Sequence, residues 1–226
     1  MTLAIAVACA GLGVAWGPLL ATLIERVPRK EPLRGAASGA VPQRLRVVVS
    51  VAAAALFSAV GVRFAGDWAL PAYLVLAASL LVVSIIDLEH YVIPNRVVYP
   101  TIALALPLLA GAAALEHGWD RLAHALIGGV VAWTLLLLVH LISPRGMGFG
   151  DVRLSFILGL YLGWLGAGHV ALGLFLGFLL GSVAGIALVI VRRRSRKEAI
   201  PFGPFLAAGA MAAVLVGDPL LRWYNR

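Results

Sequence analysis

Long segments without a single charged residue occupy most of this chain. Seven of them, 16 to 38 residues long, cover residues 1–24, 47–62, 68–86, 97–115, 122–142, 154–191 and 199–217. A helix of about 20 apolar residues is long enough to cross the hydrocarbon core of a bilayer. With 62% hydrophobic and only 12% charged residues, the chain has too much apolar surface for one soluble core, so we expect lipid to surround it.

The segment 154–191 is too long for one helix. Gly166-Ala167-Gly168-His169 forms a natural turn within it, and division there gives eight helices. We therefore predict an all-α, polytopic integral membrane protein with about eight transmembrane helices, folded as a single membrane-embedded domain over residues 1–226. Glycines recur every four residues in the two halves of this segment, which predicts closely packed helices; they are Gly159, Gly163, Gly173, Gly177, Gly181 and Gly185.

Basic residues indicate how these helices are oriented. Fourteen of the 18 lysines and arginines fall in residues 25–46, 88–96, 143–153 and 192–198, all on one predicted side. Positive charge gathers on the cytoplasmic side of membrane proteins, so we expect this side to be cytoplasmic and both termini to lie outside. The net charge of +8 is thus a sign of topology, and we do not expect nucleic-acid binding.

The single cysteine limits the chemistry of the chain. Cys9 lies inside the first apolar segment, where we expect it to pack as a small hydrophobic side chain. One cysteine allows neither an internal disulfide nor a cysteine-based zinc site. The first segment lacks the basic start of a secretory signal peptide, so we expect it to be retained as a membrane span.

Two aspartates lie at the edges of apolar segments on the predicted cytoplasmic side. Asp87 follows 19 uncharged residues and precedes Pro94 by seven, and we expect the helix to end between the two. Asp151 directly precedes the sixth predicted span. A carboxylate beside the bilayer core is costly and is therefore a candidate functional residue. The alternatives are that headgroups solvate Asp87 and that Asp151 is only the N-cap of the next helix.

Glycines before Asp151 favour a functional role. Gly146, Gly148 and Gly150 alternate through the preceding loop, and glycine permits both positive φ and close approach of another backbone. An extended peptide substrate beside the site would need such access, whereas an N-cap does not require three glycines. Two neighbouring carboxylates share one proton. The charged one can act as a general base on water, and the protonated one can donate to the scissile carbonyl.

Other residues carry weaker signals. Glu89 and His90 either support Asp87 or are solvated at the boundary. His124 and His140 are 16 residues apart, which is not the spacing of a metal-binding pair, so we expect no metal.

Two further segments also carry weaker signals. Pro201-Phe202-Gly203-Pro204 either leaves backbone groups free to pair with substrate or only starts the last helix. The basic run Arg192–Lys197 is a topology signal that also attracts anionic lipid.

At these residues the chain resembles the type IV prepilin leader peptidases, membrane aspartyl proteases with a Gly-x-Gly-Asp motif. The resemblance rests on Ile86-Asp87-Leu88-Glu89-His90 with Pro94-Asn95, on Gly146–Leu154, on Ile200–Phe205 and on residues 17–28. It implies that Asp87 and Asp151 are catalytic, and that Gly148, Gly150, Glu89, Pro201, Gly203 and Pro204 bind substrate or support the site. The implied substrates are type IV prepilins or pseudopilins of the bacterial inner membrane, cut on the cytoplasmic side without a cofactor.

One departure from the family concerns methylation. Many family members also methylate the new N-terminus and carry two Cys-x-x-Cys pairs in a larger insert after the first helix. Residues 25–46 are short and free of cysteine, so we expect a peptidase without methyltransferase activity. The alternatives are a bifunctional enzyme, a transporter that uses the aspartates as ion ligands, a non-catalytic assembly subunit and a protease that cuts within membrane spans. The sequence leaves the oligomeric state open.

Overall fold

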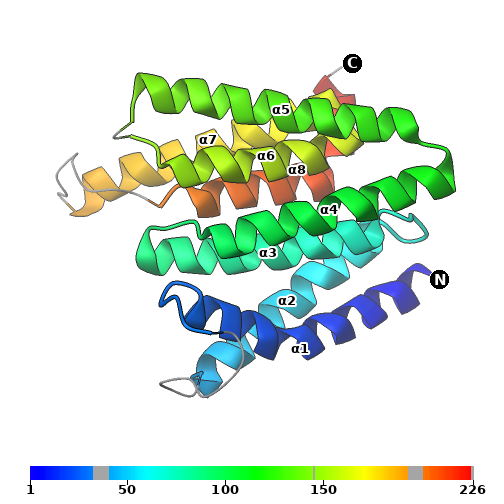
Figure 1. Ribbon diagram of the computed structural model, residues 1–226, viewed down its shortest axis with the longest axis horizontal. Coiled ribbons are helices and arrows are strands. Elements are labelled where there is room, and N and C mark those ends of the chain that lie inside the picture. The colour runs from blue at the N-terminus through cyan, green and yellow to red at the C-terminus, as the bar shows by residue number, and fades with distance from the viewer. Residues whose placement is uncertain (33–40, 145, 193–200, 225–226) are drawn as a thin grey trace. The chain divides into compact units, whose positions relative to one another are not determined.

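The computed structural model describes residues 1–32, 41–144, 146–192 and 201–224, and these form an all-α structure (Figure 1). This confirms the predicted fold class, and the helices number eight within the described residues. Gly166, at φ 126°, divides the long segment 154–191 between the sixth and seventh helices, as predicted. The helices are α1 (Thr2–Arg26), α2 (Gln43–Arg63), α3 (Leu70–His90), α4 (Asn95–Glu116), α5 (Trp119–Ile142), α6 (Phe149–Leu165), α7 (Ala167–Arg192) and α8 (Gly203–Tyr224).

The helices have the length and composition of membrane spans. Seven of those described, all except α6, are long and apolar enough to cross a bilayer. α6 has 17 residues, most of them buried. Large apolar side chains such as Leu3, Val51 and Val183 are exposed on the surface, where lipid rather than water suits them. The chain is therefore a polytopic membrane protein, as the sequence predicted.

The helices form two compact units. Unit 1 comprises Met1–Ile86 and Pro94–Gly118, and unit 2 comprises Asp87–Ile93 and Trp119–Arg226. The boundary falls inside α3, so the last turn of this helix belongs to unit 2. The prediction that residues 1–226 act as one domain stays a prediction.

Glycines allow α1 and α2 to pack closely in unit 1. A Cβ at Gly13 would lie 2.6 Å from the Ala53 carbonyl oxygen, and one at Gly61 would lie 2.8 Å from the Cys9 sulfur. Cys9 is buried in this contact, as expected for a small apolar side chain.

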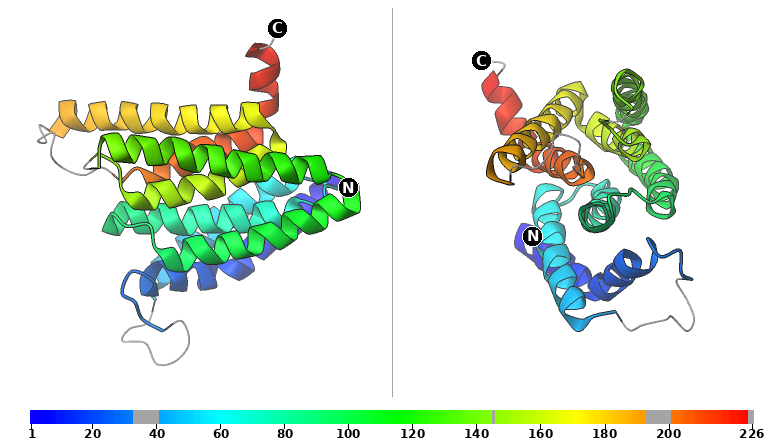
Figure 2. Two further views of the ribbon diagram at one scale, coloured as in Figure 1. Left: turned by 45° about the horizontal axis from the view of Figure 1, so that its top comes forward. Right: turned by 90° about the vertical axis from the view of Figure 1, so that its left-hand side faces the viewer.

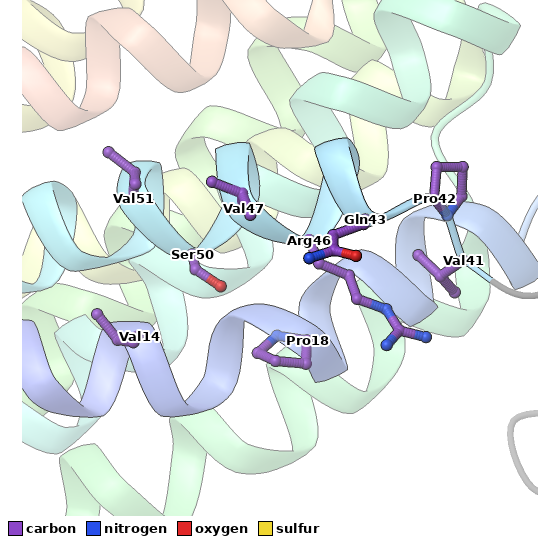
Figure 3. Close-up of a pocket in the computed structure, with 9 residues that line it drawn as sticks. All are labelled: Val14, Pro18, Val41, Pro42, Gln43, Arg46, Val47, Ser50 and Val51. Atoms are coloured by element: carbon purple, nitrogen blue, oxygen red, sulfur yellow. The ribbon is translucent and has the colours of Figure 1, made fainter.

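An open groove of about 920 Å³ lies beside this helix pair, and Figure 3 shows the side chains along it. The groove is lined by Val14, Pro18, Val41, Pro42, Gln43, Arg46, Val47, Ser50 and Val51.

Glycines also bring helices together in unit 2. In Figures 1 and 2, α5 lies beside α6 and α7 lies beside α8. A Cβ at Gly128 of α5 would lie 2.5 Å from the Gly159 carbonyl oxygen of α6. A Cβ at Gly209 of α8 would lie 2.7 Å from the Gly173 carbonyl oxygen of α7. These contacts confirm the close packing that the four-residue glycine spacing predicted.

Candidate active site

Asp87 lies in the last turn of α3 and is only 5% exposed. The helix ends at His90, between Asp87 and Pro94 as predicted, and Tyr91 follows in a left-handed conformation at φ 56°. The C-terminal end of a helix is electrostatically unfavourable for a carboxylate. The compensating donor is the N–H of Gly203, the first residue of α8, which lies 3.0 Å from Asp87 Oδ2.

Asp151 lies in the first turn of α6. The helix begins at Phe149, with Gly148 as its N-cap, so the expectation that Asp151 itself precedes and caps the helix is wrong. The Gly148 N–H donates to Asp151 Oδ2 at 3.2 Å, and the Asp151 N–H donates to the Gly148 carbonyl at 3.1 Å. This is the acidic half of a capping box, in which a side chain three residues into the helix reaches back to the cap.

Helix capping leaves one oxygen of Asp151 unexplained. The residue is 6% exposed, and its Oδ1 is buried with no hydrogen-bond partner among the described residues. Burial of an unsatisfied polar atom is costly, and each such atom in a native protein needs an explanation. Oδ2 accepts the capping hydrogen bond, whereas Oδ1 is not used by the helix.

The two carboxylates are linked through Ile93. This side chain faces both Gly203, whose N–H donates to Asp87, and Gly150, which directly precedes Asp151, and the Asp87 charge acts on Asp151. Both residues and both N–H donors lie within unit 2. Each carboxylate thus accepts a hydrogen bond from a backbone N–H at the N-terminal end of a helix, Asp151 at α6 and Asp87 at α8.

Glycine provides space around these carboxylates, but not in the way the sequence suggested. Glycine permits positive φ in the loop before Asp151, but among the described glycines only Gly66 and Gly166 adopt it, and Gly148 has φ −70°. Close approach of a substrate backbone stays a prediction, but a side chain of the protein itself does come close to Gly150. A Cβ at Gly150 would lie 2.9 Å from the Cβ of Ile93, a residue that the sequence analysis did not single out.

His140 is a second residue with a role that the sequence did not reveal. One ring nitrogen, Nδ1, lies 2.8 Å from the Met147 carbonyl oxygen, and the ring meets Phe149 edge-on at 5.5 Å between centroids. A carbonyl oxygen only accepts, so Nδ1 carries the hydrogen of this bond. His140 thus fixes the loop that precedes Asp151.

The other predicted residues occupy varied positions. Glu89 and His90 are exposed at the end of α3, and Glu89 makes no hydrogen bond or ion pair with any residue that the structure describes. Pro201 and Pro204 flank the start of α8, where the Phe202 carbonyl accepts from the N–H groups of residues 205 and 206. The segment therefore starts the last helix, and its backbone pairing with substrate stays a prediction. In the run Arg192–Lys197, residues 193–197 lie outside the described residues.

Fold and site together define a multi-pass membrane protein with a pair of buried, interacting aspartates at helix ends. The comparisons with known proteins agree: residues 74–190 match the Type IV leader peptidase family, and the chain belongs to this family. A prepilin leader peptidase/N-methyltransferase of Aeromonas hydrophila is 34% identical over 180 residues, covering 78% of this chain and 60% of that protein. Proteins of the same name from Bacillus subtilis and Pseudomonas putida are 32% and 36% identical, over 76% and 83% of this chain and 66% and 65% of theirs. No solved structure matches the chain significantly.

Proposed function

We propose that this protein is an aspartic endopeptidase in which Asp87 and Asp151 are the catalytic residues. The observation that carries the proposal is the buried pair itself. Both side chains are shielded from solvent, their charges interact, and the two are held by N–H groups of different helices. Burial and mutual repulsion together favour a pair that holds one proton between them.

The reaction follows from that shared proton. The ionised carboxylate removes a proton from a water molecule, and the water oxygen bonds to the carbonyl carbon of the scissile peptide. The protonated carboxyl donates a hydrogen bond to the carbonyl oxygen as negative charge develops there. The C–N bond then breaks, and the leaving nitrogen takes up a proton from the pair, which regenerates a singly protonated site. Asp151 Oδ1, which no described residue hydrogen-bonds, is available for this proton transfer.

The proposed substrates are type IV prepilins or pseudopilins, cleaved between a short basic leader and the apolar segment that follows. Support comes from the names of the bacterial relatives. The exposed carboxylate of Glu89, two residues from Asp87, has the charge to attract a basic leader. Gly148, Gly150, Pro201, Gly203 and Pro204 complete the proposed substrate-binding or supporting set. The basic segments favour a site at the cytoplasmic face of the bacterial inner membrane, with both termini outside.

We further propose that the enzyme cleaves without methylating. The relatives are named for both activities, and the matched region of this chain corresponds to 60% of the Aeromonas protein. The segment between α1 and α2 contains no cysteine, since Cys9 is the only cysteine in the chain and lies in α1. Incubation with prepilin and S-adenosylmethionine, followed by mass measurement of the product, tests this: one added methyl group would contradict it.

The peptidase proposal is tested by Asp87→Asn and Asp151→Asn. The full chain, purified and reconstituted in liposomes, is incubated with a synthetic prepilin, and the cut is located by mass. Each substitution removes one carboxylate with little change in size, so we expect cleavage to fall by at least about 1,000-fold. Asp120→Asn, in the exposed first turn of α5, is the matched control. Normal cleavage by either site variant would refute the proposal, and an ion flux that depends on Asp87 would favour a transporter.

A further inference from the structure

Ile93 is buried, although the residues before it in the loop between α3 and α4 are exposed. It lies in the short non-helical stretch between α3 and α4 and is 8% exposed, whereas Tyr91 and Val92 are 51% and 54% exposed. The left-handed conformation of Tyr91 and the fixed φ of Pro94 restrict the backbone on both sides of it. The Ile93 side chain is therefore the buried apolar group of this loop, and it belongs to unit 2.

The Ile93 side chain touches the first turns of two helices. At α6, a Cβ on Gly150 would lie 2.9 Å from the Ile93 Cβ and 3.4 Å from its Cγ1. At α8, a Cβ on Gly203 would lie 3.2 Å from the Ile93 Cδ1. Gly150 directly precedes Asp151, and Gly203 donates to Asp87. One side chain thus contacts both of the helix starts that hold the carboxylates.

We propose that Ile93 is the spacer that sets the separation of Asp87 and Asp151. It is a positioning residue, because its apolar side chain neither gives nor takes a proton and acts through the N-terminal turns of α6 and α8. The inference rests on the proposed peptidase function, since it concerns the spacing that function needs. Two features suit isoleucine to this role: its branched Cβ restricts χ1, and both facing positions are glycines.

The two helices meet overlapping parts of the Ile93 side chain. A Cβ on Gly150 would lie 2.9 Å from Cβ, 3.4 Å from Cγ1 and 3.6 Å from Cδ1, so Cβ and Cγ1 are the closer contacts with the α6 start. The Cδ1 atom meets Gly203, so it sets the position of the α8 start. Ile93→Val removes Cδ1, which is the contact with α8 and the most distant of the three contacts with α6, whereas Ile93→Ala also removes the closer contact of Cγ1 with α6. The two truncations should therefore lower activity in that order.

The test measures kcat and KM for cleavage of a synthetic prepilin by the full chain in liposomes, with the thermal midpoint of each variant. A misplacement of about 1 Å at a catalytic site costs on the order of 100-fold in rate. We expect kcat to fall about threefold in Ile93→Val and 10- to 100-fold in Ile93→Ala, with KM within about twofold of the wild type. Ile157→Ala, a buried truncation elsewhere in α6, should lower the thermal midpoint similarly but leave kcat unchanged.

A double substitution tests the Gly150 contact directly. Gly150→Ala should lower kcat because its new Cβ meets the Ile93 Cβ, and Ile93→Ala should not rescue it because that Cβ remains. Ile93→Gly combined with Gly150→Ala removes the Ile93 Cβ and adds a Cβ at residue 150, on the opposite side of the same contact. We expect the double variant to exceed both single variants in kcat, which is the coupling expected of residues in contact.

The outcomes separate this inference from the proposed function. If Asp87→Asn and Asp151→Asn still cleave prepilin, the peptidase proposal fails whatever Ile93 does. If those variants are inactive but Ile93→Ala loses no more kcat than Ile157→Ala, the spacer role is wrong. An additive result in the Gly150 and Ile93 double variant would likewise overturn it.

Discussion

Gly203→Ala should lower the activity of the site without substituting either aspartate. The new Cβ would lie 2.8 Å from Asp87 Oδ2 and 3.2 Å from the Ile93 Cδ1. Real Cβ atoms do not approach an oxygen this closely, so the carboxylate must move away from the α8 N-terminus. That movement breaks the 3.0 Å hydrogen bond from the Gly203 N–H. The backbone itself accepts alanine, because Gly203 does not have positive φ.

The size of the effect follows from the bond that is lost. A hydrogen bond to a charged group contributes about 1.5–3 kcal/mol, and about 1.4 kcal/mol corresponds to a tenfold change in rate. Cleavage by Gly203→Ala should therefore fall about 10- to 150-fold in kcat/KM.

Two other glycine variants serve as controls for Gly203→Ala. A Cβ at Gly111 in α4 meets nothing within 4 Å, so Gly111→Ala should cleave normally. Gly148→Ala should lose less activity than Gly203→Ala, because its Cβ lies at an ordinary 3.4 Å from Asp151 Oδ2 and its φ of −70° suits alanine. The assay is prepilin cleavage in liposomes, with thermal midpoints to detect misfolding. Normal cleavage by Gly203→Ala, or an equal loss in Gly148→Ala, would refute the assigned role of the Gly203 N–H.

Three further predictions concern other parts of the structure. His140→Asn keeps an N–H donor near the Nδ1 position and should retain more kcat than His140→Phe, which keeps the ring but not the bond to Met147; equal losses would contradict the role of that bond. Glu89→Gln should raise KM for a prepilin with a basic leader about two- to fivefold at low salt and less at high salt, and a salt-independent change would exclude electrostatic attraction. Gly13→Ala should lower the thermal midpoint, because its Cβ would lie 2.6 Å from the Ala53 carbonyl. Gly11→Ala, whose Cβ meets nothing within 4 Å, should not lower it.

Features set by local sequence were predictable here. Uncharged segments located the helices, because a bilayer admits few charges whatever the tertiary arrangement. The turn at Gly166 and the end of α3 before Pro94 also follow from neighbouring residues alone. Asp87 and Asp151 stood out for the same reason, as carboxylates beside apolar spans.

Features set by distant contacts were not predictable. α6 begins two residues before Asp151 because the loop lets Gly148 act as N-cap, and this changes Asp151 from a cap into a first-turn residue. Gly150 accommodates a side chain 57 positions earlier in the sequence rather than a positive φ. The loop between α3 and α4 is too short to show a hydrophobic periodicity. The local sequence therefore gave no sign that Ile93 contacts the first turns of both α6 and α8.

The hydrogen-bond donors to Asp87 and Asp151 affect whether the pair can hold a proton. Asp87 and Asp151 are held by backbone N–H groups at the N-terminal ends of helices. A neighbouring cation would stabilise both carboxylates in the charged form, and the shared proton that hydrolysis needs would be lost. Helix N-termini orient the carboxylates with only partial positive charge, so one of them can still hold the proton.

Ile93→Lys tests this argument, with Ile93→Met as its uncharged control of similar length. The lysine ammonium would reach the space between the first turns of α6 and α8 and stabilise both aspartates in the ionised form. We expect Ile93→Met to lose kcat by several-fold and Ile93→Lys by a further 100-fold or so, which corresponds to about 2.7 kcal/mol. Pairing with two carboxylates should keep the thermal midpoint of the lysine variant at or above that of the methionine variant. Equal cleavage by the two variants would show that the pair works without a shared proton.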